Sequence, residues 1–486
     1  MDIIFWTGLY GHAIYRPIGA YQLSHWMRKH GYSCQVIDFM QTMPAEEIIE
    51  FTEKFITTDT LCIGLSSTFW STWNKHIKRW VMSNSPPPEV VVAMKEIKKR
   101  YPHIRFVLGG SQSDVQEDDT YKLFDAVITG NGEDSFLEVC EEWRKGNKQI
   151  FATSFRGGTP YFSESLNKVF DPVCNDHMFE ANDCIIPGET LPIEISRGCI
   201  FSCKFCQYPH IGKKKNDYIR NMDLIKQEIE YNKRMFNSDK YYILDDTFND
   251  SHEKMQNWGT MLKDLDFDIK YTSYLRADLL SRNPEQIEIF RDTGMVSAMF
   301  GIESFDPQGS MLVGKGWSGK EAKTFLPDLM RQWKNDITFH ISMIVGIPPE
   351  TYKDYRIHQD WCIENKIPSW VWQILGINTK PRTFESEFDR NYKKYGFELT
   401  NPGVTRDWKT SYMDSKEAAR IATTLNGEQA KNDLQKMTCW VALAYMSLGY
   451  SHEYLNNVLE KDFNYKELYS KQNAFVAEYK RLLRNL

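Results

Sequence analysis

The beginning of the chain alternates short apolar runs with longer amphipathic patterns. Between the apolar runs, stretches such as IGAYQLSHWMRKH and VVVAMKEIKKR place apolar residues at helical spacing. Strands that alternate with helices of this length are typical of a parallel, doubly wound sheet. We therefore predict a Rossmann-like α/β domain over residues 1–145. Its predicted strands lie at residues 2–6, 34–39, 61–66, 105–110 and 126–130.

Two segments interrupt this alternation. Between the third and fourth predicted strands, Trp73, Ile77 and Trp80 fall at helical spacing and predict a packed helix. The run Pro86–Pro88 should stop that helix. Residues 146–190 hold many Gly, Asn and Asp residues and few periodic stretches, so we predict an irregular connector there.

A second series of strand and helix patterns begins at Leu191. Its six strand–helix units predict a curved parallel sheet, two units short of a closed eight-fold barrel. We predict this partial barrel over residues 191–384, followed by a helical C-terminal region at 385–486. The predicted strands lie at 191–196, 240–246, 269–276, 296–304, 338–346 and 370–378.

Composition narrows the function classes. Charged residues make up 26% of the 486 residues and the net charge is −6. The chain therefore lacks the excess of basic residues that is typical of proteins that bind DNA or RNA. No apolar run approaches the ~18 residues of a membrane span. The N-terminus lacks a basic segment, so we expect no signal peptide. Ten cysteines without export signals indicate a reducing compartment, which we take to be the cytoplasm.

Only three of the cysteines are clustered, in the stretch SRGCIFSCKFCQYPH directly after the first strand of the second series. Three thiolates on one loop can hold three irons of a [4Fe–4S] cube and leave the fourth iron open for another ligand. Two alternatives remain at this point. The thiols Cys199, Cys203 and Cys206 could bind zinc together with His210, or they could merely share a loop.

The stretch CIFSCKFC, with an aromatic residue before its last cysteine, resembles the CxxxCxΦC signature of radical S-adenosylmethionine enzymes. In that family the open iron binds the amino and carboxylate groups of S-adenosylmethionine, and one electron cleaves the sulfonium to give a 5′-deoxyadenosyl radical. The resemblance covers about residues 190–380, including the strand-end motifs DDTFN, GIES and IVGIPPE. It implies that S-adenosylmethionine contacts Phe205, Tyr208, Asp245, Asp246, Arg276, Glu303, Val345 and Ile347.

Small and polar residues also follow successive strands of the first domain, where parallel sheets bind ligands. The stretches YRPIGAYQLSHWMRKHGYSCQVIDF, VLGGSQSD and ITGNGEDSF resemble the cobalamin-binding subfamily of these enzymes. One motif departs from it: in YGHAIY, Tyr10 and Tyr15 replace the Asp and Gly of DxHxxG, so we do not expect His12 to bind cobalt. The resemblance implies cobalamin contacts at Tyr15, Pro17, Gly19, Ser66, Ser67, Gly109, Gly110, Gly130, Gly132 and Glu133.

The subfamily implies methylation of an unactivated carbon, with cobalamin as the methyl carrier and a flavodoxin- or ferredoxin-type electron donor as partner. A radical rearrangement or cyclisation without methyl transfer is the first alternative, and a non-catalytic corrinoid- or zinc-binding protein is the second. The substrate stays open among a small molecule, a peptide side chain and a nucleobase. The basic loop at 210–220 could meet an anionic substrate, although solvation is the simpler role.

Overall fold

The structure is a computed structural model of residues 1–486. At residues 71–74, 79–82 and 163 the structure describes the backbone alone. The residues that the structure describes are 1–8, 14–67, 70–74, 79–82, 85–110, 113–114, 116–147, 152–163, 178–206, 218–334, 336–378, 385–401, 407–429 and 441–486.

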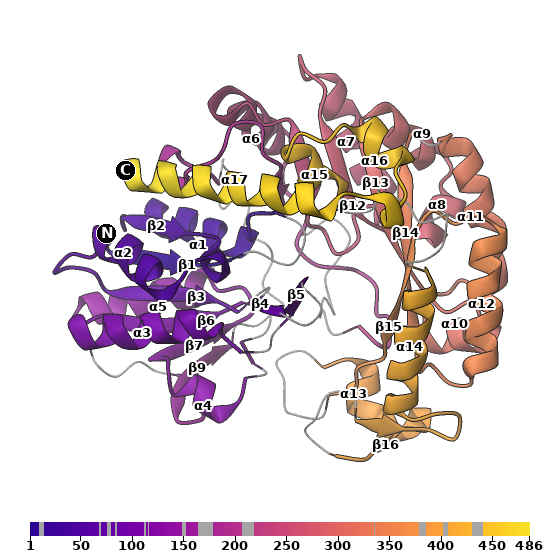
Figure 1. Ribbon diagram of the computed structural model, residues 1–486, viewed down its shortest axis with the longest axis horizontal. Helices are drawn as coiled ribbons and strands as arrows, with labels where there is room; N and C mark the ends of the chain where they lie inside the picture. Colours follow the sequence, from indigo (N-terminus) through magenta and orange to yellow (C-terminus); the bar gives the residue numbers. More distant parts are fainter. Residues whose placement is uncertain are drawn as a thin grey trace. The chain divides into compact units, whose positions relative to one another are not determined.

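The first sheet has seven strands in the order β2-β1-β3-β6-β7-β9-β8 (Figure 1). The five predicted strands are confirmed, and the pairs among them are all parallel. Their order is the doubly wound one in which chain direction across the sheet switches between β1 and β3. The strands are β1 (Ile3–Trp6), β2 (Cys34–Ile37), β3 (Cys62–Ser66), β6 (Arg105–Gly109), β7 (Ala126–Thr129), β8 (Ser154–Arg156) and β9 (Thr159–Ser163).

Helices cover both faces of this sheet, since α1 packs beside α5 and α2 packs beside α3. Because both faces are covered, the central strands β1, β3, β6 and β7 are mainly apolar rather than alternating. Trp6 and Phe106 meet across the sheet with ring centroids 5.7 Å apart, and both are fully buried. The helices are α1 (Ile18–Lys29), α2 (Ala45–Phe55), α3 (Pro88–Arg100), α4 (Asp118–Tyr121) and α5 (Glu133–Arg144), with short 3₁₀ turns η1 (Met40–Thr42) and η3 (Ala181–Asp183).

Two predictions for this part of the chain are wrong. The segment with the two tryptophans forms an antiparallel pair, β4 (Ser71–Asn74) and β5 (Arg79–Met82), in which the backbone of Trp73 is opposite Trp80. Two apolar residues seven positions apart can lie two turns apart on a helix, or opposite each other in a hairpin. Here they lie opposite each other in a hairpin. The connector is not wholly irregular either, because β8 and β9 extend the first sheet.

The second sheet has six strands in sequence order, β10 to β15 (Figure 1). All six predicted strands are confirmed, and the pairs from β11 to β15 are parallel. The strands are β10 (Leu191–Ile193), β11 (Lys240–Ile243), β12 (Lys270–Leu275), β13 (Met295–Glu303), β14 (Thr338–Val345) and β15 (Trp370–Ile374). The helices between them are α6 (Met222–Phe236), α7 (His252–Lys263), α8 (Ala277–Arg282), α9 (Glu285–Asp292), α10 (Pro307–Val313), α11 (Gly319–Trp333) and α12 (Tyr352–Glu364).

The C-terminal region is mainly helical, as predicted, with one short two-stranded sheet, β16–β17. Its helix α14 lies against the edge strand β15, where the Asn426 amide hydrogen-bonds both the N–H and the C=O of Trp372. This contact covers backbone groups that an edge strand would otherwise expose. Its elements are α13 (Glu387–Asn391), η4 (Tyr392–Tyr395), β16 (Glu398–Leu399), β17 (Trp408–Lys409), α14 (Ser415–Gln429), α15 (Ala442–Ser447), α16 (His452–Asn457), η5 (Glu460–Asp462) and α17 (Tyr465–Asn485).

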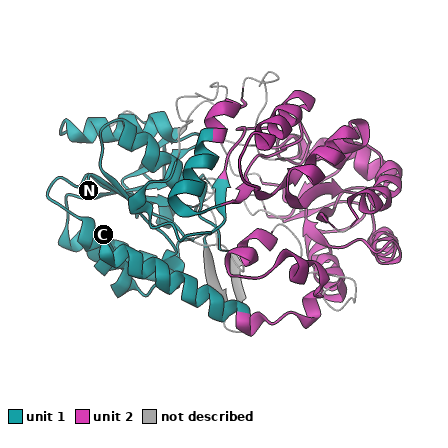
Figure 2. Cartoon of the chain, turned by 90° about the horizontal axis from the view of Figure 1, so that it is seen from above, with its two compact units in different colours: residues 1–192, 227–238, 468–486 teal, residues 193–226, 239–467 magenta. Residues whose placement is uncertain are grey.

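The chain forms two compact units (Figure 2). The first contains residues 1–192, 227–238 and 468–486, and the second contains 193–226 and 239–467. The end of α17 therefore belongs to the first unit, where the Tyr479 hydroxyl accepts a hydrogen bond from Asp38 N at 2.8 Å. The predicted functional boundaries at 145, 190 and 384 stay a prediction.

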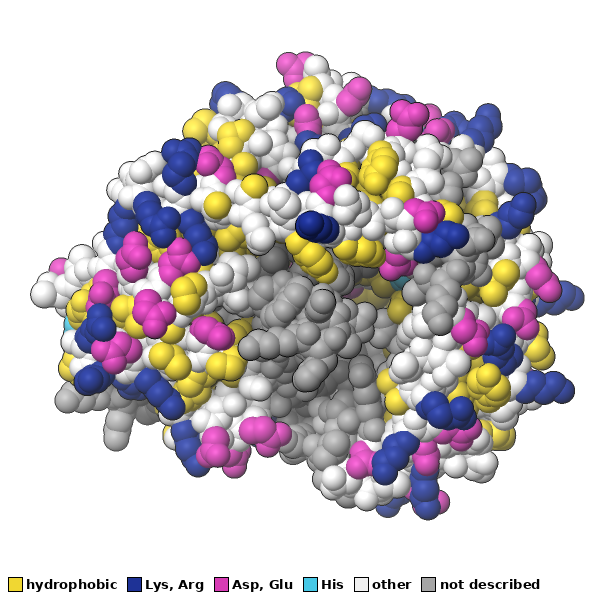
Figure 3. Space-filling model, in the orientation of Figure 1, with side chains coloured by type: hydrophobic (Ala, Val, Ile, Leu, Met, Phe, Trp, Pro, Cys, Tyr) yellow, Lys and Arg dark blue, Asp and Glu magenta, His cyan; other side chains and the backbone are white. Residues whose placement is uncertain are grey.

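On the face drawn in Figure 3, basic and acidic side chains of the described residues are interspersed. This pattern agrees with the balanced composition. Among the helices of the described segments, none combines the length and apolar character that crossing a membrane requires.

Candidate active site

The cysteine-containing segment begins and ends at one place in the second unit. An antiparallel bridge pairs Ser196 with Ile219. Two further backbone bonds close the base of this loop: Arg197 N donates to Tyr218 O at 3.1 Å, and Arg220 N donates to Ile195 O at 2.9 Å. The loop thus leaves the carboxyl end of β10 from a fixed base.

A buried charge network supports this base. The Asp245 carboxylate accepts hydrogen bonds from Ile195 N and Ser196 N, each at 2.9 Å. Lys254 Nζ lies 3.2 Å from Asp245 and 2.6 Å from Asp250, and all three side chains are fully or almost fully buried. The Tyr218 hydroxyl donates to Asp250 at 2.6 Å, so Lys254 connects the two ends of the loop through two carboxylates. Sequence reasoning missed Lys254, whose only signal is a lysine in the first turn of a helix.

Asp245 therefore differs from its predicted surroundings. The resemblance implies that Asp245 contacts S-adenosylmethionine, but its oxygens accept hydrogen bonds from the protein at the base of the loop. Burial raises its pKa to about 6 against the attraction of Lys254. Its neighbour Asp246 is exposed, so of this predicted pair Asp246 is the carboxylate accessible to a ligand.

The three clustered thiols are half-buried and lie on the loop that this base supports. Cys199 Sγ is 3.4 Å from Thr247 Oγ1 at the end of β11, and burial raises the pKa of its thiol. Cys206 N donates to Cys203 O at 3.0 Å, which makes a tight turn between the last two thiols. Phe205, within that turn, is half-buried, whereas Tyr208 and His210 lie outside the described residues.

The donor set fits an iron–sulfur cube. Three half-buried thiols on one loop are soft ligands, and the Arg276 cation lies 3.5 Å from one of them, Cys203 Sγ. In the described part of the chain, no three His, Cys, Asp or Glu side chains are grouped so as to hold a metal ion. A cube does not require such convergence, because each thiolate binds a different iron.

Arg276 and Glu303 both stand at strand ends, as predicted, and both already have partners. The Arg276 guanidinium pairs with Asp278 and contacts Cys203 Sγ at 3.5 Å. Glu303, at the end of β13, has left-handed backbone with φ 70°, and its Oε1 lies 2.8 Å from Lys315 Nζ. The side chains of Arg276 and Glu303 are thus both held in position by other groups of the protein.

The turn after β14 is shaped by a glycine. Gly346 has φ +110°, and a Cβ there would lie 2.5 Å from the ring of Trp408. The neighbouring side chains of Val345 and Ile347 are fully buried, so only their backbone can face an adenine. Trp408 belongs to the C-terminal region, and sequence reasoning missed its role here.

The predicted ligand face of the first unit lies at the carboxyl edge of the first sheet. Ser67 N donates to Gly109 O at 2.7 Å, which joins the turns after β3 and β6. Gly110 and Gly130 have φ of +95° and +98°, a conformation that favours glycine. Tyr15 and Pro17 precede α1, and Gly19 in its first turn is exposed with open space where a Cβ would point. Ser66, Gly132 and Glu133 complete the predicted set at the ends of β3 and the start of α5.

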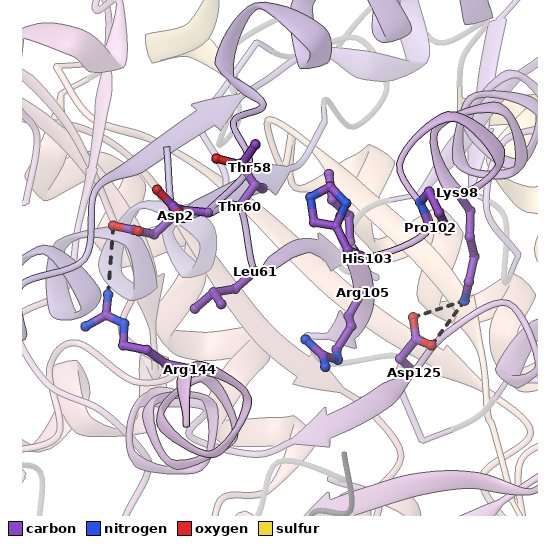
Figure 4. Close-up of a pocket in the computed structure, with 12 residues that line it drawn as sticks. Asp2, Thr58, Thr60, Leu61, Lys98, Pro102, His103, Arg105, Asp125 and Arg144 are labelled. Carbon is purple, nitrogen blue, oxygen red and sulfur yellow. Dashed lines mark hydrogen bonds and ion pairs between the residues drawn. The ribbon is translucent and has the colours of Figure 1, made fainter. Parts of the chain in front are cut away.

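A cavity of about 820 Å³ lies at the opposite, amino-terminal edge of the same sheet (Figure 4). Its lining carries both signs of charge, and Lys98 already pairs with Asp125 while Arg144 faces Asp2 at 3.9 Å. Parallel sheets bind their ligands at the carboxyl ends of strands, so we do not assign the site to this cavity.

Comparison with known proteins agrees with the second unit's geometry. The profile of the Radical SAM superfamily matches residues 193–362, which span β10 to α12. The chain contains a radical S-adenosylmethionine domain. The three thiols lie inside this radical SAM domain, as do Asp246, Arg276 and Glu303.

Relatives and solved structures extend the similarity beyond the radical SAM domain. The chain is 24% identical to the hopanoid C-3 methylase of Methylococcus capsulatus over 387 residues, which cover 75% of this chain and 66% of the relative. It is 27% identical over 134 residues to the bacteriochlorophyllide d C-8(2)-methyltransferase of Chlorobaculum tepidum, covering 26% of this chain and 29% of the relative. The chain thus spans less than two thirds of either protein.

Two solved structures share the fold over nearly the whole chain. The radical S-adenosylmethionine methyltransferase TsrM of Kitasatospora setae, with cobalamin and a [4Fe–4S] cluster bound, has a TM-score of 0.62 at 13% identity and covers 98% of this chain and 100% of its own. The cobalamin-dependent radical enzyme OxsB, with aqua-cobalamin and S-adenosylmethionine bound, has a TM-score of 0.63 at 13% identity, covering 99% and 72%. The predicted fold, a doubly wound domain followed by a partial barrel, is confirmed.

Proposed function

We propose that this protein is a cobalamin-dependent radical S-adenosylmethionine methyltransferase that acts on an unactivated carbon. The observation that carries the proposal is the set of three thiols on a loop held at the carboxyl end of β10, within a radical SAM domain. Both relatives found by sequence are methylating enzymes by name, and TsrM shares the fold.

In this proposal Cys199, Cys203 and Cys206 hold the cluster, and the base of the loop fixes their positions. The bound cluster supplies one electron that cleaves S-adenosylmethionine reductively, and bound cobalamin carries the methyl group. The chain's own residues orient the nucleoside and methionine parts: exposed Asp246 faces the ammonium, and the Gly346 turn offers backbone to the adenine.

Cobalamin belongs, in this proposal, to the carboxyl edge of the first sheet. That edge presents small residues, with exposed Gly19 in the helix after β1 and exposed Gly110 and Gly130 after β6 and β7. Doubly wound sheets hold flat cofactors at this edge, next to the switch point between β1 and β3. The residues that would hold cobalamin are the ten that the resemblance implies, of which Tyr15 is the first and Glu133 the last in the sequence. No axial histidine is assigned, because Tyr10 replaces the Asp that would orient His12; both residues lie outside the described residues.

An external one-electron donor of the flavodoxin or ferredoxin type completes the proposed system, and the cytoplasm is its proposed compartment. The eight described cysteines are free thiols, which suits a reducing environment. The substrate is proposed only by chemical class, as a molecule with an unactivated carbon–hydrogen bond.

The test is a product balance. Protein reconstituted anaerobically with iron, sulfide and hydroxocobalamin is reduced and supplied with S-adenosylmethionine and candidate substrates. Methyl transfer predicts S-adenosylhomocysteine and 5′-deoxyadenosine together with methylated product. Deoxyadenosine alone would replace the proposal with a radical rearrangement or cyclisation without methyl transfer. A protein without cluster or nucleoside product would be a non-catalytic corrinoid- or zinc-binding protein.

A further inference from the structure

The guanidinium of Arg276 is fixed in place beside one of the three thiols. Its Nε and Nη2 donate to the two oxygens of Asp278, each at 2.9 Å, and Nη2 also donates to Lys315 O at 2.7 Å. The face of the group lies over the Phe201 ring, 4.0 Å from its centroid. The residue is only 7% exposed, so water competes little for these contacts.

With this orientation fixed, Nη1 donates to Cys203 Sγ at 3.5 Å. Among the described residues, protein contacts occupy four of the five N–H groups, and the one that remains is also on Nη1. The resemblance implies that Arg276 contacts S-adenosylmethionine, but only one of its N–H groups remains for such a contact. The geometry instead directs the free edge of the guanidinium at a cluster ligand.

We propose that Arg276 sets the reduction potential of the cluster by donating a hydrogen bond to the Cys203 thiolate. This inference rests on the proposed function. Hydrogen bonds to cluster sulfurs and nearby positive charge stabilise the more negative, reduced state and so raise the potential. Asp278, Lys315 and Phe201 act through Arg276 by holding the donor on the sulfur. Arg276 is thus a tuning residue of the radical SAM domain.

The test is a redox titration of the reconstituted cluster, followed by electron paramagnetic resonance, in the absence of S-adenosylmethionine. Without the substrate, loss of a contact to its carboxylate cannot change the result. For Arg276→Gln we expect a ratio of reduced to oxidised cluster about tenfold lower at the wild-type midpoint, which is 59 mV for a one-electron couple. Arg276→Lys keeps the charge but not the fixed fork, and we expect a smaller shift in the same direction.

The matched control is Arg282→Gln. Arg282 is the last residue of α8, the helix whose N-cap is Arg276, and it donates to Gly316 O at 2.9 Å, next to Lys315, but it has no contact with a thiol among the described residues. The Arg282→Gln substitution removes one positive charge but leaves the hydrogen bond from Arg276 to Cys203 intact. We therefore expect the wild-type midpoint potential. A wild-type midpoint in both Arg276 variants would overturn the inference, and so would equal shifts in all three variants.

Iron and sulfide content is measured for every protein. If Arg276→Gln holds no cluster, Arg276→Lys decides the question, and loss of the cluster there too would overturn tuning in favour of a supporting role. Wild-type protein without a cluster would contradict the proposed function itself. A wild-type cluster that cleaves S-adenosylmethionine, with unshifted Arg276 variants, would contradict this inference alone.

Discussion

Lys254 Nζ lies 3.2 Å from the Asp245 carboxylate at the base of the cysteine loop, and neither side chain is exposed. Asp245 in turn accepts hydrogen bonds from the backbone of Ile195 and Ser196, four and three residues before the first thiol. Burying an ion pair costs desolvation free energy, but removing only one of its partners destabilises the protein strongly, because the other charge is left buried without a partner. The pair therefore fixes where the loop begins.

Replacing Lys254 with Met should destabilise the cluster-free protein in a pH-dependent way. Removing one partner of a buried pair costs about 3–5 kcal/mol. Burial raises the folded-state pKa of Asp245 from 3.8 to about 6, so stability from its protonation is present below about pH 4 and lost as pH rises through 6. Without Lys254 that pKa rises further, and the loss should be larger at pH 8 than at pH 5. Chemical denaturation at both pH values measures it.

Lys263→Met is the control for this prediction. Lys263 is exposed in the last turn of the same helix α7, and we expect a change within about 0.5 kcal/mol at either pH. An equal loss at pH 5 and pH 8 in Lys254→Met would show that the charge of Asp245 is not what Lys254 compensates.

Replacing Gly346 with Ala should disturb the turn after β14. The added Cβ would meet the Trp408 ring at 2.5 Å in a backbone with φ +110°, so we expect a loss of about 1–3 kcal/mol and weaker S-adenosylmethionine binding. Gly427→Ala is the matched substitution, because Gly427 lies within α14 with no atom within 4 Å of its Cβ position. It should stabilise by about 0.5–1 kcal/mol. Denaturation and equilibrium dialysis of S-adenosylmethionine measure both effects.

Replacing Tyr479 with Phe should weaken the first unit although the residue is only seven positions from the end of the sequence. Its hydroxyl accepts from Asp38 N, and the ring lies 5.0 Å from the buried Arg16 guanidinium. Leaving the Asp38 N–H unsatisfied costs about 1–3 kcal/mol. Tyr412→Phe, at an exposed ring, should change stability by less than about 0.5 kcal/mol. Similar values for the two variants would mean that α17 is not part of the first unit's core.

Local patterns predicted what depends on local sequence. Buried strands such as β1 and β13 read as apolar runs, and parallel order then placed Ser66, Gly109 and Glu303 at carboxyl ends. The spacing of Cys199, Cys203 and Cys206 is also local, since three thiols within eight consecutive residues that follow a strand share one loop.

Contacts between different elements could not be predicted in this way. Nothing near Lys254 in sequence shows that it meets Asp245 across the end of β11, or that Trp408 packs on Gly346. The backbone register of Trp73 opposite Trp80 depends on a turn, whereas their spacing alone fits a helix. In each case the deciding partner lies on another element.

The central claim is that three thiols hold a cluster that cleaves S-adenosylmethionine. Cys203→Ala and Cys362→Ala, the latter a buried thiol on α12 away from the loop, are reconstituted anaerobically with wild-type protein. The measurement is 5′-deoxyadenosine formed from S-adenosylmethionine after reduction by dithionite, per mole of protein. We predict product from the wild type and from Cys362→Ala and at least a hundredfold less from Cys203→Ala. Equal product from Cys203→Ala and the wild type would contradict the account.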